Sequence, residues 1–148
     1  MELIVYLAGE IHSDWRDTIQ DAVEERGLPV EFLSPVTDHP ASDEVGVRIL
    51  GPEESDFWKD HKGAKVNAMR TRTAIERSDV VVVSFGEKYR QWNAAFDAGY
   101  AAAMGKMLVV IHSEEFNHAL KELDGAAQAV CRRPEQVVEL LDYVTQKE

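Results

Sequence analysis

One acidic residue, Asp97, stands in a stretch of small and apolar residues and is the first candidate for chemistry in this chain. The stretch, residues 91–106, lies between apolar β-branched runs at 80–83 and 108–111, and Gly105 suits the end of a helix. A carboxylate on a helix that packs against a sheet costs free energy unless it is paired, solvated or used. Asp97 is therefore either a functional carboxylate or a hydrogen-bonded acid that only stabilises its helix.

The residue four positions before it, Asn93, lies on the same face of such a helix. We expect the helix to begin near Asn93, whose side chain would cap the first turn. Asp97 would then lie within a turn of the positive end of the helix dipole, which favours the ionised carboxylate by roughly 0.3–1 kcal/mol. An ionised, oriented carboxylate is equipped for nucleophilic attack or for stabilising a cationic transition state.

Two further acids leave apolar runs at their carboxyl ends: Glu10 follows the run at 3–8, and Glu87 follows the run at 79–84. Ligands bind beyond the carboxyl ends of parallel strands, so we expect Glu10, Glu87 and Asp97 to form an anionic crevice. Such a crevice suits a neutral or cationic ligand, or a sugar oxocarbenium ion, with one acid attacking and another moving protons. The residues that we expect to contact the ligand are Tyr6, Gly9, Gly86, Trp92 and Asn93.

The turn after the first run argues against a cofactor. Gly9-Glu10 lacks the glycine spacing of dinucleotide and phosphate loops, and Glu10 places negative charge where a phosphate would bind. The five histidines show no metal-ligand spacing, and only His12 and His112 are expected near the crevice. We therefore expect no cofactor and no metal centre, with Mg²⁺ at the acids as a weaker alternative.

Strand-like runs alternate with helical patterns along the chain. Strands are predicted at 3–8, 30–33, 79–84, 108–111 and 128–131, and helices at 13–26, 66–77, 92–104, 114–123 and 134–146. This alternation predicts an α/β fold, namely a single-domain, open parallel five-stranded sheet with helices on both faces. We favour a flavodoxin- or Rossmann-like strand order of 2-1-3-4-5, with the crevice between the first and third strands.

An insertion at residues 34–65 interrupts this alternation. It carries three prolines and several acids, and we expect it to be partly helical. A connection of this length is usually functional or contains short helices of its own. It is either a flap over the crevice or a decorative insertion.

Composition limits the classes of function. The 148 residues fit one domain, 1–148, and 27 acidic against 16 basic residues give a formal charge of -11, which disfavours nucleic-acid binding. The amino-terminal residues lack a signal-peptide pattern, and no apolar run has the length of a membrane span. The single cysteine, Cys131, is expected to be a buried thiol. We expect a cytoplasmic protein with no membrane partner.

Several segments resemble a known family. YLAGE at 6–10, SDVVVV at 78–83 and AFDAGYA at 95–101 resemble the nucleoside 2-deoxyribosyltransferase superfamily, and FGEKY at 85–89 and QWN at 91–93 match its YtoQ branch. The resemblance covers nearly the whole chain. It implies a parallel-sheet fold and an enzyme that cleaves or transfers the N-glycosidic bond of a nucleoside or a related N-ribosyl compound.

The resemblance also implies roles for single residues. In the superfamily a glutamate on the matching helix attacks the anomeric carbon, and here Asp97 stands at that position, with Glu87 or Glu10 as acid and base. Gln91 stands where the superfamily usually has an aspartate, and Asn93-Ala94 replaces a Gly-Thr-like turn. A homo-oligomer with shared active sites is implied as well. Because of these departures, the alternative is a non-catalytic nucleoside- or nucleotide-binding sensor module on the same fold. The anionic crevice predicts a preference for uncharged nucleosides, whereas a preference for monophosphates would point to Arg70, Arg72 or Arg90 as phosphate partners.

Overall fold

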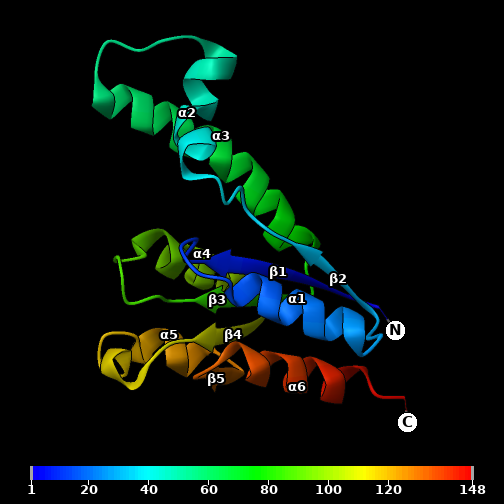
Figure 1. The fold of residues 1–148 in the computed structure, drawn as a ribbon. Helices are drawn as coiled ribbons and strands as arrows, with labels where there is room; N and C mark the ends of the chain where they lie inside the picture. Colours follow the sequence, from blue (N-terminus) through cyan, green and yellow to red (C-terminus); the bar gives the residue numbers. More distant parts are fainter. Residues whose placement is uncertain (1, 148) are drawn as a thin grey trace.

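A five-stranded parallel sheet forms the centre of the computed structural model, which describes residues 2–147 (Figure 1). Its strands are β1 (Leu3–Gly9), β2 (Val30–Leu33), β3 (Val80–Ser84), β4 (Met107–Ile111) and β5 (Ala129–Cys131). Their order, β2-β1-β3-β4-β5, confirms the α/β fold and the strand order predicted from the sequence. Gly9 pairs with Ser84 and Ser84 with Ile111, so the three central strands end at the same edge of the sheet.

Helices cover both faces of the sheet. They are α1 (Trp15–Glu25), α2 (His39–Leu50), α3 (Asp56–Arg77), α4 (Trp92–Ala103), α5 (Lys121–Ala126) and α6 (Pro134–Thr145), with a 3-10 turn at Glu114–Phe116. Helices α1 and α6 pack on one face through residues at helical spacing, such as Ile19 and Val23 of α1 and Val138 and Leu141 of α6. Helix α4, with α5 and the last turns of α3, packs on the other face. None of the helices in the described range has the length and apolarity needed to cross a bilayer.

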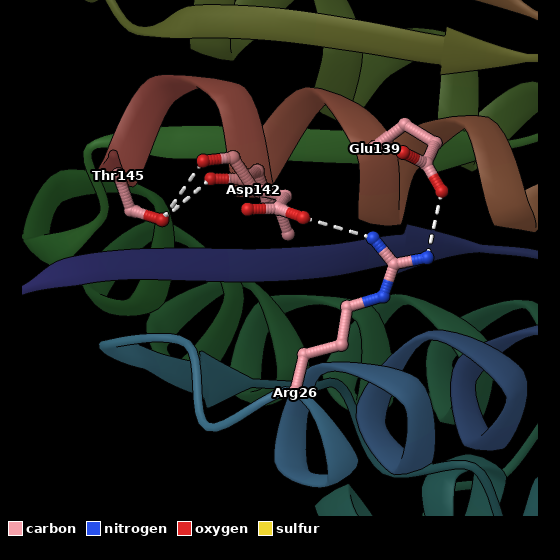
Figure 2. A network of polar contacts seen from close by, with 5 residues as sticks. Arg26, Glu139, Asp142 and Thr145 are labelled. Atoms are coloured by element: carbon pink, nitrogen blue, oxygen red, sulfur yellow. Dashed lines mark hydrogen bonds and ion pairs between the residues drawn. The ribbon is translucent and has the colours of Figure 1, made fainter. Parts of the chain in front are cut away.

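An exposed ion-pair network also joins α1 to α6. The Arg26 guanidinium lies just beyond α1 and donates to Glu139 at 2.7 Å and to Asp142 at 2.9 Å (Figure 2). Both acids lie on α6, one turn apart, so a single guanidinium bridges two helical turns. The pairs face solvent, so the apolar contacts beneath them contribute most of the helix packing.

The insertion is mostly helical, and the helix predicted at 66–77 begins ten residues earlier than expected. The side chain of Ser55 accepts a hydrogen bond from the amide of Trp58 at 3.3 Å and caps the start of α3. Helices α2 and α3 run side by side and extend away from the sheet as an arm (Figure 1). They meet closely because a Cβ at Gly46 would lie 2.7 Å from the backbone nitrogen of Gly63.

The single helix predicted at 114–123 is wrong. The chain forms the 3-10 turn at Glu114–Phe116 and then α5, with a non-helical turn between them. The buried imidazole of His112 lies 2.9 Å from the carboxylate of Asp124 and holds α5 beside the carboxyl end of β4. This tertiary contact decides where the short helix lies, and the local apolar pattern carries no sign of it.

Candidate functional site

A cavity of about 1070 Å³ lies at the carboxyl end of β1. The turns after β1 and β2 line it, and so do the loop before α4, the inner face of α4, and parts of α2 and α3. It therefore lies at the edge of the sheet that the topology predicts, and the insertion at 34–65 supplies one of its walls. Its volume is close to the upper end of the range for small-molecule sites.

The turn after β1 needs a glycine at position 9. Gly9 has a φ of +114°, and a Cβ there would lie 2.7 Å from the backbone nitrogen of Ser84 on β3. Only glycine adopts this conformation at little cost, and only glycine leaves room for the neighbouring strand. Gly9 thus brings the start of the Glu10 turn directly against β3.

A buried arginine holds the same turn from the side of α1. The Arg16 guanidinium donates to the carbonyl oxygens of Leu7 at 3.1 Å, Glu10 at 2.6 Å and Gly9 at 3.2 Å. The indole nitrogen of Trp15 also donates to the Glu10 carbonyl, at 2.9 Å. Burial lowers the pKa of Arg16 from its usual value. These contacts fix the backbone at the mouth of the cavity.

The carboxylate of Glu10 is engaged within its own turn. It accepts hydrogen bonds from the amide of His12 at 2.7 Å and from the hydroxyl of Ser13. Gly86 packs against this side chain, because a Cβ at position 86 would lie 3.0 Å from the Glu10 Cγ. Glu10 lines the cavity, but each of its two carboxylate oxygens accepts a hydrogen bond from this turn.

Helix α4 carries Asp97 into the cavity. Gln91 occupies the cap position, and its side chain accepts a hydrogen bond from the amide of Gly86 at 3.0 Å. The prediction that Asn93 caps this helix is wrong, because the helix begins one residue earlier, at Trp92. Asp97 therefore lies six residues beyond the cap, in the second turn, where the helix dipole acts weakly.

Burial dominates the electrostatics of Asp97. It raises the pKa of Asp97 from 3.8 to about 6, which is the opposite of the shift that the helix dipole was expected to produce. Burial also raises the pKa of Tyr6 to about 12, and the charge on Asp97 adds to that rise. The hydroxyl of Thr71 and the charges of Arg16 and Arg70 act in the other direction. Asp97 and Arg70 thus each lie within electrostatic reach of Tyr6.

The cavity brings together some of the predicted site residues and leaves others outside. Its lining includes Tyr6, Gly9, Glu10, Asn93 and Asp97. Glu87 and Trp92 have exposed side chains outside this lining, and Gly86 lies behind Glu10. His12 lines the cavity beside Tyr89, whereas His112 is buried against α5, so the prediction that His112 lies near the crevice is wrong.

The sequence predicted a crevice lined by acids, but four basic side chains line the cavity beside the acids Glu10, Asp43, Asp60 and Asp97. The basic side chains are Lys65, Arg70 and Arg72 from α3 and Arg90 from the loop before α4. From the sequence, Arg70, Arg72 and Arg90 were only alternative phosphate partners, because the approach of α3 to the cavity is a tertiary contact that local periodicity does not record. The Ser55 cap after Pro52 was the signal that could have placed Lys65 on the same helix. Within residues 2–147, no three His, Cys, Asp or Glu side chains are grouped for a metal ion.

Two solved structures share this fold. A 2-deoxyribosyltransferase from Bacillus psychrosaccharolyticus matches with a TM-score of 0.58 and 15% identity, over 91% of this chain and 90% of its own. A conserved protein from Enterococcus faecalis V583 matches with a TM-score of 0.63 and 14% identity, over 97% of this chain and 99% of its own. At these identities the two likenesses show the fold alone.

Sequence comparison gives a nearer relative and a family. The chain is 42% identical to the Bacillus subtilis (strain 168) protein described as "Uncharacterized protein YtoQ", over the full length of both chains. The model of the family described as nucleoside 2-deoxyribosyltransferase YtoQ matches residues 6–145. The resemblance predicted from the sequence is confirmed, and the chain belongs to the nucleoside 2-deoxyribosyltransferase YtoQ family.

Proposed function

We propose that this protein cleaves or transfers the N-glycosidic bond of a nucleoside or a related N-ribosyl compound, with Asp97 as the nucleophile. The observation that carries this proposal is the half-buried carboxylate of Asp97, which lines a cavity large enough to hold a nucleoside, together with Tyr6. Membership of a family named for nucleoside 2-deoxyribosyl transfer supports the same reaction class.

The reaction that we propose has two steps. A carboxylate oxygen of Asp97 bonds to the anomeric carbon while the bond from that carbon to the base nitrogen breaks, and its electron pair leaves with the base, which takes a proton from water. The resulting glycosyl ester is then opened by water, which gives hydrolysis, or by a nitrogen of a second base, which gives transfer. Stabilising the cationic sugar in both steps needs a carboxylate that is ionised.

The acid–base properties of Asp97 suit this role. With a pKa of about 6, the carboxylate is ionised in about 90% of molecules at pH 7. A raised pKa also makes an ionised carboxylate a stronger nucleophile than one in water. We assign Glu10 to holding the turn at Gly9, because each of its oxygens already accepts a hydrogen bond. Glu87 has no part in the proposed reaction, because its side chain is exposed outside the cavity.

The test is release of free base from a panel of ribo- and 2′-deoxyribonucleosides and their monophosphates, followed by chromatography. At least one member should release base, and Asp97→Asn should abolish the release. Asp21→Asn makes the same chemical change at an exposed position of α1, on the other face of the sheet, and should leave the rate unchanged. Thermal stabilisation by one compound without base release from any would favour the non-catalytic binding module.

We also propose that the protein forms a homo-oligomer in which a second copy covers the arm formed by α2 and α3. Large apolar side chains are exposed along this arm, namely Ile49, Leu50, Phe57, Trp58 and Met69. A monomeric protein rarely exposes so many large apolar side chains on one pair of helices. Lys65 and Arg70 of α3 line the cavity, so a second copy that packs on the arm would lie beside the candidate site.

A further inference from the structure

Three of the arginines that line the cavity have no ion-pair partner in the described part of the chain. Among residues 2–147, Arg26, Lys59, Lys62 and Arg77 each lie within 4.0 Å of a carboxylate, whereas Arg70, Arg72 and Arg90 have no such partner. Within that range Arg16, Arg48, Arg132 and Arg133 lack such a partner as well, so what distinguishes Arg70, Arg72 and Arg90 is that all three line one cavity.

The contacts that these arginines do make leave donors available. Arg70 donates to the carbonyl oxygen of Ser34 at 3.4 Å, and the Arg72 guanidinium lies 5.9 Å from the centre of the Tyr100 ring. A guanidinium has five N–H donors, so both side chains keep several for a ligand. Guanidinium groups match the oxygens of a phosphate in charge and in geometry.

The four acids that line the cavity form no ion pair with Arg70, Arg72 or Arg90. Asp43 lies 3.1 Å from His39, and Glu10 is engaged within its own turn. Asp60 also lines the cavity, from the part of α3 nearer the end of the arm. Asp97 is the acid assigned to the sugar carbon, so the arginines are left to bind a different part of the ligand.

The arginines come from two different elements around the cavity that Asp97 also lines. Arg70 and Arg72 project from α3, whereas Arg90 lies on the loop that leads into α4, next to the Gln91 cap. Arg70 and Asp97 both act electrostatically on Tyr6, so this arginine and the carboxylate border one continuous space. A ligand with its sugar carbon at Asp97 would therefore have an arginine within the same cavity for a group carried on that sugar.

We infer that Arg70, Arg72 and Arg90 form a phosphate subsite, and that the substrate class is a nucleoside monophosphate and not an uncharged nucleoside. This inference rests on the proposed function, because it places the sugar of the same ligand at Asp97. It reverses the expectation, drawn from the acids alone, that the site prefers a ligand without negative charge.

The first measurement compares kcat/KM for base release from a monophosphate and from its matching nucleoside. The monophosphate should be preferred by about tenfold to a hundredfold, the range expected for charge-assisted hydrogen bonds. Arg70→Gln and Arg90→Gln should each remove most of this preference by lowering kcat/KM for the monophosphate alone. Arg48→Gln, at an exposed position of α2 outside the cavity, should leave the preference unchanged.

A binding measurement separates failure of the subsite from failure of the reaction. Calorimetry with wild-type protein and Asp97→Asn should show tighter binding of 5′-monophosphates than of nucleosides, with Arg70→Gln removing the difference. Ribose 5-phosphate, 3′-monophosphates and inorganic phosphate, each as a competitor, show where the phosphate group must lie on the ligand. Tighter binding without base release from any compound would leave the subsite standing and contradict the proposed reaction. Base release or binding with equal preference for nucleosides would overturn the phosphate subsite alone.

Discussion

Tyr6 on β1 and Asp97 on α4 line the same cavity, and the charge on Asp97 adds to burial in raising the pKa of Tyr6 to about 12. The phenol therefore keeps its proton at any physiological pH. Burial holds the pKa of Asp97 at about 6, so the acid changes charge just below neutral pH. The stability of the protein should depend on this acid in a measurable way.

Asp97→Asn should stabilise the protein above about pH 6. The folded-state pKa of about 6 exceeds the unfolded value of 3.8, so the folded state binds a proton more tightly, and stability falls as pH rises from about 4 to about 6. Asparagine does not ionise and does not share this loss. Urea unfolding should show a gain of about 1–3 kcal/mol for the variant at pH 8 and no difference below about pH 4. A constant difference across this pH range would contradict the assignment of burial as the cause.

Gly9→Ala should destabilise the fold by about 2–4 kcal/mol, because the new Cβ meets the backbone of Ser84 and the φ of +114° is strained for alanine. Gly125→Ala is the control, since a Cβ at this position in α5 meets nothing within 4 Å. That control should be neutral or more stable by up to about 1 kcal/mol. Equal midpoints of chemical unfolding for the two variants would refute the close contact between β1 and β3.

Arg16→Gln should cost about 2–4 kcal/mol of unfolding free energy, because the three carbonyl oxygens at the end of β1 lose their buried donor. Arg26→Gln removes an arginine at the other end of α1 whose ion pairs face solvent, and it should change the unfolding midpoint little. Guanidinium chloride titrations followed by tryptophan fluorescence compare the two. If Arg26→Gln lowered the free energy of unfolding as much as Arg16→Gln, the buried hydrogen bonds of Arg16 would not be the cause of the predicted loss.

The protein should be larger than a monomer when light scattering is measured after size-exclusion chromatography at micromolar concentration. Trp58→Glu should shift it toward the monomer, because the charge enters the apolar face of the arm. Tyr143→Glu makes a similar change at an exposed position of α6 and should leave the mass unchanged. A monomeric wild-type protein would remove the proposed partner on the arm.

The sheet was predictable because its strands carry an unusually clear signal. Val80–Ser84 is buried at every position, and a fully apolar run between helical patterns leaves little choice of structure. The first half of α3 lacked that signal, since Phe57 and Trp58 are exposed and the helix packs mainly against α2. Its start was marked only by the cap at Ser55.

The candidate site was predictable only in part. Tyr6, Glu10 and Asp97 were found because the topology fixes which strand and helix ends meet at one edge of the sheet. Arg70, Arg72 and Arg90 were named only as alternative phosphate partners, because the approach of α3 to α4 is a tertiary relationship that local periodicity does not record. His112 was misplaced for a related reason: its side chain turns toward Asp124 of α5, a direction that the strand pattern does not set.

The most direct test of the central claim is the mass of the intact protein after it is mixed with a reactive nucleoside or nucleoside monophosphate and quenched in acid. A covalent ester should add the mass of the sugar, or of the sugar phosphate, and peptide mapping should place it on Asp97. Asp97→Asn should show neither the added mass nor the release of base. Base release that persists in Asp97→Asn would contradict the account.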